Sequence, residues 1–145
     1  MKLEVTVICL VLAMASGALA HVGVKNAAVM ARMDAMKTIG AGMKTIGQMA
    51  KGETRFNATE ARAAAADIAR HAAQTHRLFE AREDDPKSEA KAEIWENFAA
   101  FVAISDDLAS IASNLSRTIE TKADLPAAMA AMGRTCRDCH NLYRE

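Results

Sequence analysis

Aromatic residues, proline and glycine are scarce in this sequence. Its 145 residues include one tryptophan, one tyrosine, four phenylalanines, two prolines and seven glycines. β-Sheets favour aromatic and β-branched side chains, whereas alanine, which is abundant here, has the highest helix propensity. The composition therefore argues against a sheet and predicts an all-α protein.

An excess of charge of either sign is also missing. Eighteen lysines and arginines balance eighteen aspartates and glutamates, so the formal net charge is zero. Proteins that bind nucleic acids or anionic membrane surfaces usually carry blocks of basic residues. The sequence has no such block, and we expect no nucleic-acid partner.

The first twenty residues have the layout of a secretory signal peptide. Lys2 is followed by an apolar run over residues 5–14 and by small residues that end at Ala20. That run is too short to cross a hydrocarbon layer of roughly 30 Å. We therefore expect cleavage after Ala20 and no membrane span afterwards. Residues 21–145 then form a single exported domain, which in a bacterium lies in the periplasm.

Cysteine is scarce for an exported protein. Such proteins are commonly cross-linked by disulfides, yet residues 21–145 contain only Cys136 and Cys139. Two cysteines separated by two residues indicate a chemical site rather than a disulfide framework.

Four helical segments with short connections follow the expected signal peptide. The first ends at Lys51 and Gly52, a basic residue and a glycine typical of a helix C-terminus. The second begins after Asn57, a capping residue that Glu60 extends to a capping box. Pro126 lies in the first turn of the fourth. This pattern favours an antiparallel up-down-up-down four-helix bundle. The expected helices cover residues 24–50, 58–81, from 88–91 to 120, and 124–145.

The first helix has a regular pattern of apolar and small residues. Their spacing of four and three residues is that of a helix packed at a shallow angle against a neighbour. We expect this seam to face the other helices, with a close neighbour at its two glycines. The seam consists of Val29, Met33, Met36, Gly40, Met43, Gly47 and Ala50.

The motif that predicts chemistry lies near the end of the chain. Cys136, Cys139 and His140 form a CxxCH pattern, which attaches c-type haem. Because helical positions i, i+3 and i+4 share a face, both thiols and the imidazole point to the same side. The thiols can form thioethers with the two porphyrin vinyl groups, and His140 can bind the iron. We therefore predict one covalent haem c.

Two other sites would use the same residues. A thioredoxin-like redox CxxC needs a strand-to-helix turn, which an all-helical chain does not provide. A zinc site needs four ligands, and only His21, His71 and His76 are left to complete it. His71 and His76 are five residues apart, which does not place them on one helix face.

Because CxxCH stands close to the C-terminus, the chain resembles the class II cytochromes c, the cytochrome c′ family. The resemblance covers residues 21–145, including Ala50-Lys51-Gly52, Glu93-Ile94-Trp95 and the terminal Cys136-Arg137-Asp138-Cys139-His140-Asn141-Leu142-Tyr143-Arg144. It implies a four-helix bundle with haem bound near the C-terminal helix. The sequence departs from the family pattern after Leu78-Phe79, where a charged run replaces a loop rich in glycine and proline.

The other side of the iron is expected to face the N-terminal half of the first helix, because the first and fourth helices are antiparallel. Met33 and Met36 lie there. The resemblance places Met36 opposite the iron, Arg32 near the haem propionates, and Arg144 near the haem and its histidine. In the low-spin branch of the family the iron-facing residue is a ligating methionine. In the high-spin branch it leaves a five-coordinate iron that binds gases such as NO or CO.

Methionine is also a common gap-filler in helical cores. Because Met36 supplies the sulfur that the low-spin branch requires, we expect a periplasmic electron-transfer cytochrome with His140 and Met36 as axial ligands. Its partners would be redox proteins, and nothing in the sequence resembles an enzyme's acid, base or nucleophile. The alternative is a five-coordinate cytochrome c′-like protein that binds NO or CO. The resemblance also allows a homodimer through the first two helices, to which Ile39 and Ile46 would contribute unless they complete the core.

Overall fold

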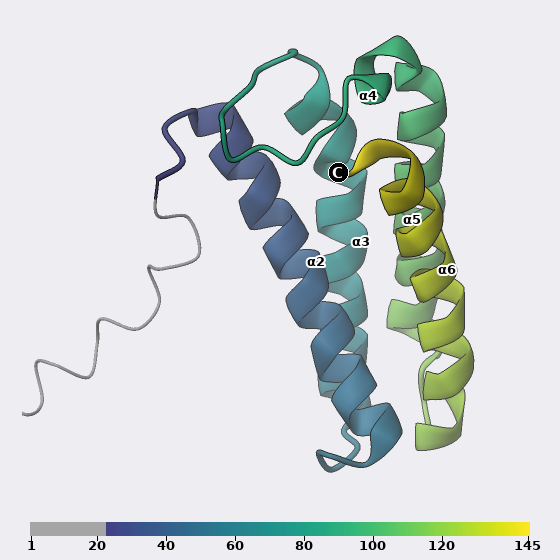
Figure 1. Ribbon diagram of the computed structural model, residues 1–145. Coiled ribbons are helices and arrows are strands. Elements are labelled where there is room, and N and C mark those ends of the chain that lie inside the picture. Colours follow the sequence, from purple (N-terminus) through teal and green to yellow (C-terminus); the bar gives the residue numbers. More distant parts are fainter. Residues whose placement is uncertain (1–22) are drawn as a thin grey trace, which may run out of the picture.

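A computed structural model describes residues 23–145, which form a bundle of four long helices (Figure 1). The expected signal peptide, residues 1–20, and His21 lie outside the described residues. Successive long helices run in opposite directions, and the C-terminus lies between the upper ends of α2 and α6 (Figure 1). The expected all-α up-down-up-down bundle is confirmed. The elements are α2 (Ala27–Lys51), α3 (Ala58–Phe79), α4 (Glu93–Glu96), α5 (Phe98–Thr118), η3 (Lys122–Asp124) and α6 (Leu125–Tyr143).

The helix ends follow from capping residues in the sequence. The Asn26 side chain accepts hydrogen bonds from two backbone N–H groups at the start of α2, and Asn57 does the same for α3. Gly52 ends α2 with a φ of 79°, a left-handed conformation that glycine adopts without strain. The expected third helix is instead two, because Asn97 leaves the helical conformation (φ −127°, ψ 44°) and separates α4 from α5.

The face of α2 that packs into the bundle differs from the expected seam. Of the seven predicted seam residues, only Val29 is fully buried, and the buried positions follow a neighbouring line along the helix. α2 is apolar over two adjacent faces, so the same spacing fits either of them. The face with the buried positions packs in the core. The neighbouring face, with Met33, Met36, Gly40 and Met43, lines a cavity. The buried positions of α2 are Val29, Arg32, Ala35, Ile39, Gly42, Ile46 and Met49.

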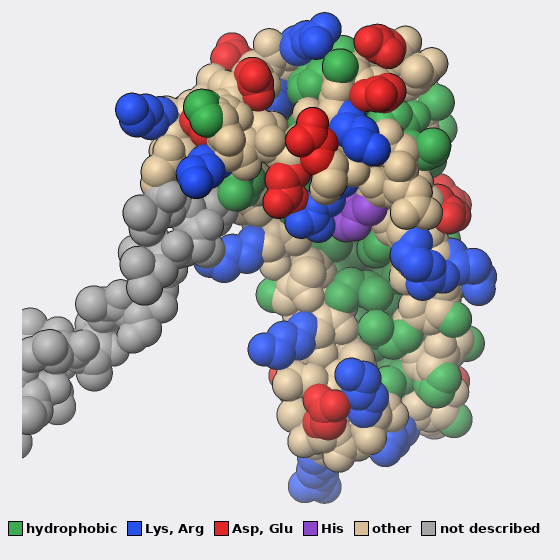
Figure 2. Space-filling view, viewed as in Figure 1, with side chains coloured by type: hydrophobic (Ala, Val, Ile, Leu, Met, Phe, Trp, Pro, Cys, Tyr) green, Lys and Arg blue, Asp and Glu red, His purple; other side chains and the backbone are tan. Residues whose placement is uncertain are grey.

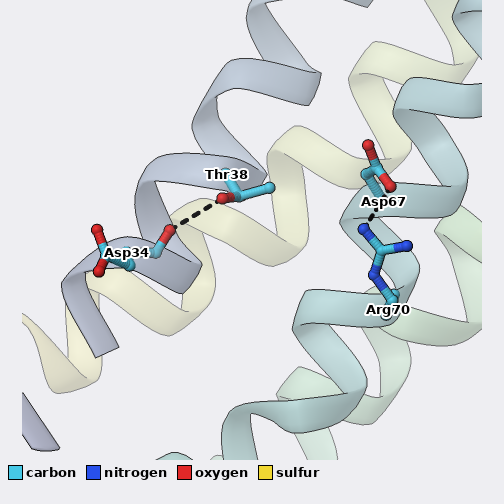
Figure 3. Close-up of polar contacts among 4 residues, drawn as sticks. All are labelled: Asp34, Thr38, Asp67 and Arg70. Carbon is cyan, nitrogen blue, oxygen red and sulfur yellow. Dashed lines mark hydrogen bonds and ion pairs between the residues drawn. The ribbon is translucent and has the colours of Figure 1, made fainter. Parts of the chain in front are cut away.

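Ile39 and Ile46 belong to this packed face. Both are buried in the bundle core, so of the two roles that the sequence left open for them they complete the core. Away from the cavity, Figure 3 shows polar groups that bond within their own helices. The Thr38 hydroxyl donates to the Asp34 carbonyl in α2, and Arg70 pairs with Asp67 in α3. A homodimer through these helices stays a prediction.

α2 approaches α3 closely at Gly42, which the expected seam omitted. A Cβ there would lie 2.8 Å from Cγ1 of Ile68 and 3.1 Å from the carbonyl oxygen of Ala64. We expect Gly42→Ala to lower the free energy of unfolding by about 1–3 kcal/mol, the usual cost of overpacking. Chemical denaturation of the purified protein measures this difference.

Gly133 of α6 provides the matched control, because a Cβ there would meet only the end of the Arg137 side chain, at 3.6 Å. Gly133→Ala should stabilise the protein by up to about 1 kcal/mol through helix propensity alone. Equal effects of the two substitutions would show that α2 and α3 are not in close contact at Gly42.

The core of the bundle has two parts. The larger core fills the bundle, and the smaller core, formed by Phe79, Ile94, Phe101 and Tyr143, lies near the C-terminus. Helix α5 is long and apolar enough to cross a membrane, the only such helix among residues 23–145, but a core helix of a soluble protein passes the same test. α5 packs against α3 and α6, and its buried residues are Phe101, Ser105, Leu108 and Ala112. Because α2 and α6 touch each other least among neighbouring long helices, the bundle opens between them.

Candidate functional site

A cavity of about 570 Å³ lies where α2 and α6 separate. This volume falls in the range of roughly 300–1,000 Å³ that is typical of cofactor and ligand pockets. Its walls come from all four long helices and from the segment between α3 and α4. Figure 2 shows apolar side chains in this depression, with a histidine and charged side chains above them.

One wall of the cavity carries the CxxCH residues. Cys136, Cys139 and His140 all lie on α6 and line the cavity, and both cysteines are free thiols. Cys136 packs against the larger core and Cys139 against the smaller one. The predicted geometry is therefore present: two thiols and an imidazole face the same apolar space.

Burial controls the ionisation of these three groups. It raises the pKa of both thiols, and burial, with a smaller contribution from the negative charge of Cys136, raises the pKa of Cys139 to about 11. Burial, together with the positive charge of Arg144, lowers the pKa of His140. At neutral pH the imidazole is therefore neutral, the form that binds a metal. The donor set and the apolar walls fit a haem, held by Cys136 and Cys139 as thioethers and by His140 at the iron.

The α2 wall is lined by methionine and glycine. Met36, whose side chain is 36% exposed, lines the cavity together with Met33 and Met43. Gly40 leaves open space, because no atom lies within 4 Å of the position that a Cβ would occupy. Met36 therefore lies on the cavity wall that the first helix supplies.

Arg32 has a role that the sequence did not reveal. Only 3% of the residue is exposed, and its guanidinium donates to the carbonyl oxygens of Leu78 (2.8 Å), Ala81 (2.6 Å) and Glu83 (2.8 Å). It also lies over the ring of Phe79, 4.7 Å from the centroid. Arg32 therefore holds the end of α3 and the following turn against α2. It lines the cavity as well, and its predicted place beside a propionate stays a prediction.

The sequence contains a signal for this role. Arg32 stands three residues after Val29 and three before Ala35, which places a charged residue on the apolar face that α2 buries. A buried arginine needs acceptors, and helix C-terminal carbonyls provide them. Burial lowers the pKa of Arg32, although Glu83 and Asp84 oppose this shift.

The C-terminus is tied across one end of the cavity to the segment between α3 and α4. The Lys91 N–H donates to the Tyr143 carbonyl at 3.0 Å, and the Glu145 N–H donates to the Glu89 carbonyl at 2.9 Å. The Arg144 guanidinium pairs with the Glu89 carboxylate at 2.6 Å. Arg144 therefore lines the cavity and contributes to the lowered pKa of His140, and its predicted place near the haem stays a prediction.

Asp85 fixes the charged segment after α3 to the start of α2. Its side chain, in a residue only 6% exposed, accepts hydrogen bonds from the backbone N–H groups of Lys25 (2.8 Å), Asn26 (3.0 Å) and Lys87 (2.9 Å). These bonds lower the pKa of Asp85 below its ordinary value of 3.8. The charged run that departs from the family pattern is therefore an ordered part of the site.

A pH-dependent stability follows from Asp85. Because its pKa is lower in the folded protein, ionised Asp85 stabilises the fold above the unfolded value of 3.8. This contribution is lost as pH falls through the folded pKa. We expect Asp85→Asn to destabilise the protein at neutral pH and the difference from wild type to shrink below pH 3.8. Denaturation at a series of pH values measures it, and a difference independent of pH would contradict this role.

The zinc alternative has no support in the structure. Among residues 23–145, no three histidine, cysteine, aspartate or glutamate side chains lie together in a group that could hold a metal ion. The residues of CxxCH are placed for one imidazole ligand and two covalent attachments.

Comparison with known sequences identifies the family. A family model described as cytochrome C′ matches residues 27–144. A cytochrome c′ from Rhodopseudomonas palustris is 30% identical over 146 residues, covering 99% of this chain and 97% of that protein. A cytochrome c-556 from Agrobacterium fabrum is 33% identical over 110 residues, covering 75% of each chain.

Solved structures share the fold. A cytochrome c′ structure from Rhodopseudomonas palustris matches with a TM-score of 0.77 and 28% identity, covering 83% of this chain and 98% of that one. A nitric oxide complex of a mutant cytochrome c prime from Alcaligenes xylosoxidans matches with a TM-score of 0.70 and 21% identity, covering 81% of this chain and 93% of that one.

These comparisons correct one expectation. The sequence led us to expect a low-spin electron-transfer cytochrome in which Met36 is the second axial ligand beside His140. This expectation is wrong. The relative that covers 99% of the chain is a cytochrome c′, as is the R. palustris structure with the TM-score of 0.77. They favour the five-coordinate interpretation, in which Met36 lines the cavity without binding the iron. A methionine beside a cofactor is often only a filler of irregular space.

The remaining expectations about the cofactor agree with the comparisons. Three observations indicate a covalently bound haem: the position of CxxCH near the C-terminus, the cavity lined by both thiols and the histidine, and the family match over residues 27–144. The chain belongs to the cytochrome c′ family, whose members carry covalently bound haem c.

Proposed function

We propose that this protein is a periplasmic haem protein that binds a small gas, NO or CO, at a five-coordinate iron. The observation that carries the proposal is the unequal chemistry of the cavity walls. α6 offers an imidazole and two thiols, whereas α2 offers the thioethers of Met33, Met36 and Met43 and open space at Gly40. A small apolar molecule can occupy the space beside such a wall.

The relatives support this proposal. The nitric oxide complex from Alcaligenes xylosoxidans has the same fold, and so does a carbon monoxide complex of another variant of that protein. Their common fold supports gas binding here. The relatives compared above are bacterial, and the signal peptide expected over residues 1–20 supports export to the periplasm.

Each residue has a distinct task in this proposal. Cys136 and Cys139 fix the haem to α6, and His140 binds the iron from that side. When bound, the haem would supply an iron that can take up a diatomic ligand. Met36, which lines the cavity, would limit the size of what can enter. We propose binding rather than catalysis, because the α2 wall is mostly apolar, with Arg32 and Lys37 as its charged side chains.

Substitution of Met36 tests the proposal. We expect the ferrous wild-type protein to be high-spin and to bind CO, and Met36→Ala to keep the same spin state. CO binding should become about tenfold tighter in Met36→Ala, equivalent to about 1.4 kcal/mol of relieved crowding. Absorption spectra during CO titration measure both properties.

Met30 of α2 is the control, because it does not line the cavity. Met30→Ala should bind CO as wild type does. If the wild-type protein did not bind CO and Met36→Ala did, the proposal would be contradicted, because Met36 would then be bound to the iron in the wild-type protein.

A further inference from the structure

Four cationic side chains border the cavity in which the haem fits. Arg32 and Lys37 come from α2, Lys87 from the segment between α3 and α4, and Arg144 from the C-terminus. The rest of the lining is mostly apolar. These four cations are the groups that could neutralise the two carboxylates of a haem.

The direction of those carboxylates follows from the covalent attachment. The two vinyl groups and the two propionates of haem lie at opposite edges of the ring. Cys136 and Cys139 fix the vinyl edge against the larger and smaller cores, so the propionate edge points away from them. Carboxylates buried without partners are costly, and we expect them at the mouth of the cavity beside cations or water.

The two arginines are already engaged. Arg32 uses three N–H groups on the carbonyls of Leu78, Ala81 and Glu83, and it is almost completely buried. Arg144 pairs with Glu89 through both Nε and a terminal nitrogen, each at 2.6 Å. To bind a propionate, either arginine would have to give up contacts that hold the segment after α3 in place.

The two lysines are available. Neither Lys37 nor Lys87 has a carboxylate partner within residues 23–145, and both are exposed. The Lys87 backbone is fixed, because its N–H donates to Asp85 at 2.9 Å. The two lysines therefore offer free ammonium groups from two different walls of the same mouth.

We infer that Lys37 and Lys87 bind the haem propionates and that Arg32 instead positions the segment after α3. This inference rests on the covalent haem and not on the gas that the iron binds. The charged segment that replaces the family's glycine- and proline-rich loop thus supplies one of the two propionate ligands. The ordering of that segment by Arg32 and Asp85 places Lys87 at the mouth.

Zero-length cross-linking of the haem-loaded protein tests the inference. A carbodiimide joins a carboxylate to a neighbouring lysine amine as an amide, and the water lost is taken up as the urea of the reagent. After proteolysis, mass spectrometry should find the haem peptide with Cys136 and Cys139 joined to peptides that contain Lys37 or Lys87. Each link should be lost in the corresponding Lys37→Gln or Lys87→Gln protein.

Lys44 is the matched control, an exposed lysine of α2 that does not line the cavity. Lys44→Gln should leave both links unchanged. A second readout is the reduction potential, which should fall in Lys37→Gln and Lys87→Gln and recover in Lys37→Arg and Lys87→Arg. Haem joined to neither lysine, with potentials equal to that of Lys44→Gln, would overturn the inference. Gas binding is scored separately by the CO titration, so the two proposals fail independently.

Discussion

Simultaneous replacement of Cys136 and Cys139 by alanine is expected to abolish covalent haem attachment. Both thiols line the cavity on one face of α6 and have no disulfide partner among residues 23–145. Without them, only His140 and apolar contacts would hold a haem. Acidified organic solvent should extract all haem from the double variant and none from wild type, which reduces covalent haem from one per chain to zero. Absorbance of the extracted and retained fractions measures this.

The single variants and a surface change complete this experiment. Cys136→Ala and Cys139→Ala should each retain part of the haem through one thioether. Leu142→Ala should retain all of it, because Leu142 lies on the same helix but is 54% exposed and outside the cavity lining. Haem that resists extraction from the double variant would show that other residues attach it.

Arg32→Leu is expected to be the most destabilising single substitution among those considered. Removal of the guanidinium leaves the carbonyls of Leu78, Ala81 and Glu83 without the donor that they share. Bonds to a charged donor contribute roughly 1.5–3 kcal/mol each, and the three bonds here are part-buried, so carbonyls that lose their donor carry part of a further desolvation penalty. We expect the free energy of unfolding to fall by about 3–5 kcal/mol. Chemical denaturation measures the loss.

Arg144→Gln is the matched control, since it removes another arginine that contacts the same segment. Its ion pair with Glu89 is exposed, so at most about 1 kcal/mol should be lost. Arg32→Lys keeps the charge but cannot reach three carbonyls at once, and it should fall between the two. If Arg32→Leu does not fold, Arg32→Lys gives the comparison. Losses no greater than that of Arg144→Gln would refute the buried role of Arg32.

The sequence predicts the fold well because its signals are local. Asn57 and Gly52 mark helix ends through their own backbone and side-chain chemistry, and both caps are present in the structure. The CxxCH residues depend only on helical spacing within α6, which explains why their common direction was predictable. The short links between long helices then leave the antiparallel bundle as the simplest arrangement.

Other features depend on contacts between distant segments. The packed face of α2 is set by contacts such as Gly42 against Ile68, and the spacing within α2 alone fits the cavity face equally well. The partners of Arg32 lie 46 to 51 residues away, in a turn with no strong local signal. Asn97 interrupts a segment whose sequence predicts one continuous helix. The coordination of iron depends on a distance to Met36 that no sequence pattern fixes.

The ferric absorption spectrum of the wild-type protein, matured in a host that attaches c-type haem, tests the central claim most directly. We expect a covalently bound, high-spin haem whose spectrum has no sulfur-to-iron charge-transfer band. A low-spin spectrum with that band would contradict it, because a thioether from α2 would then close the iron site to gases.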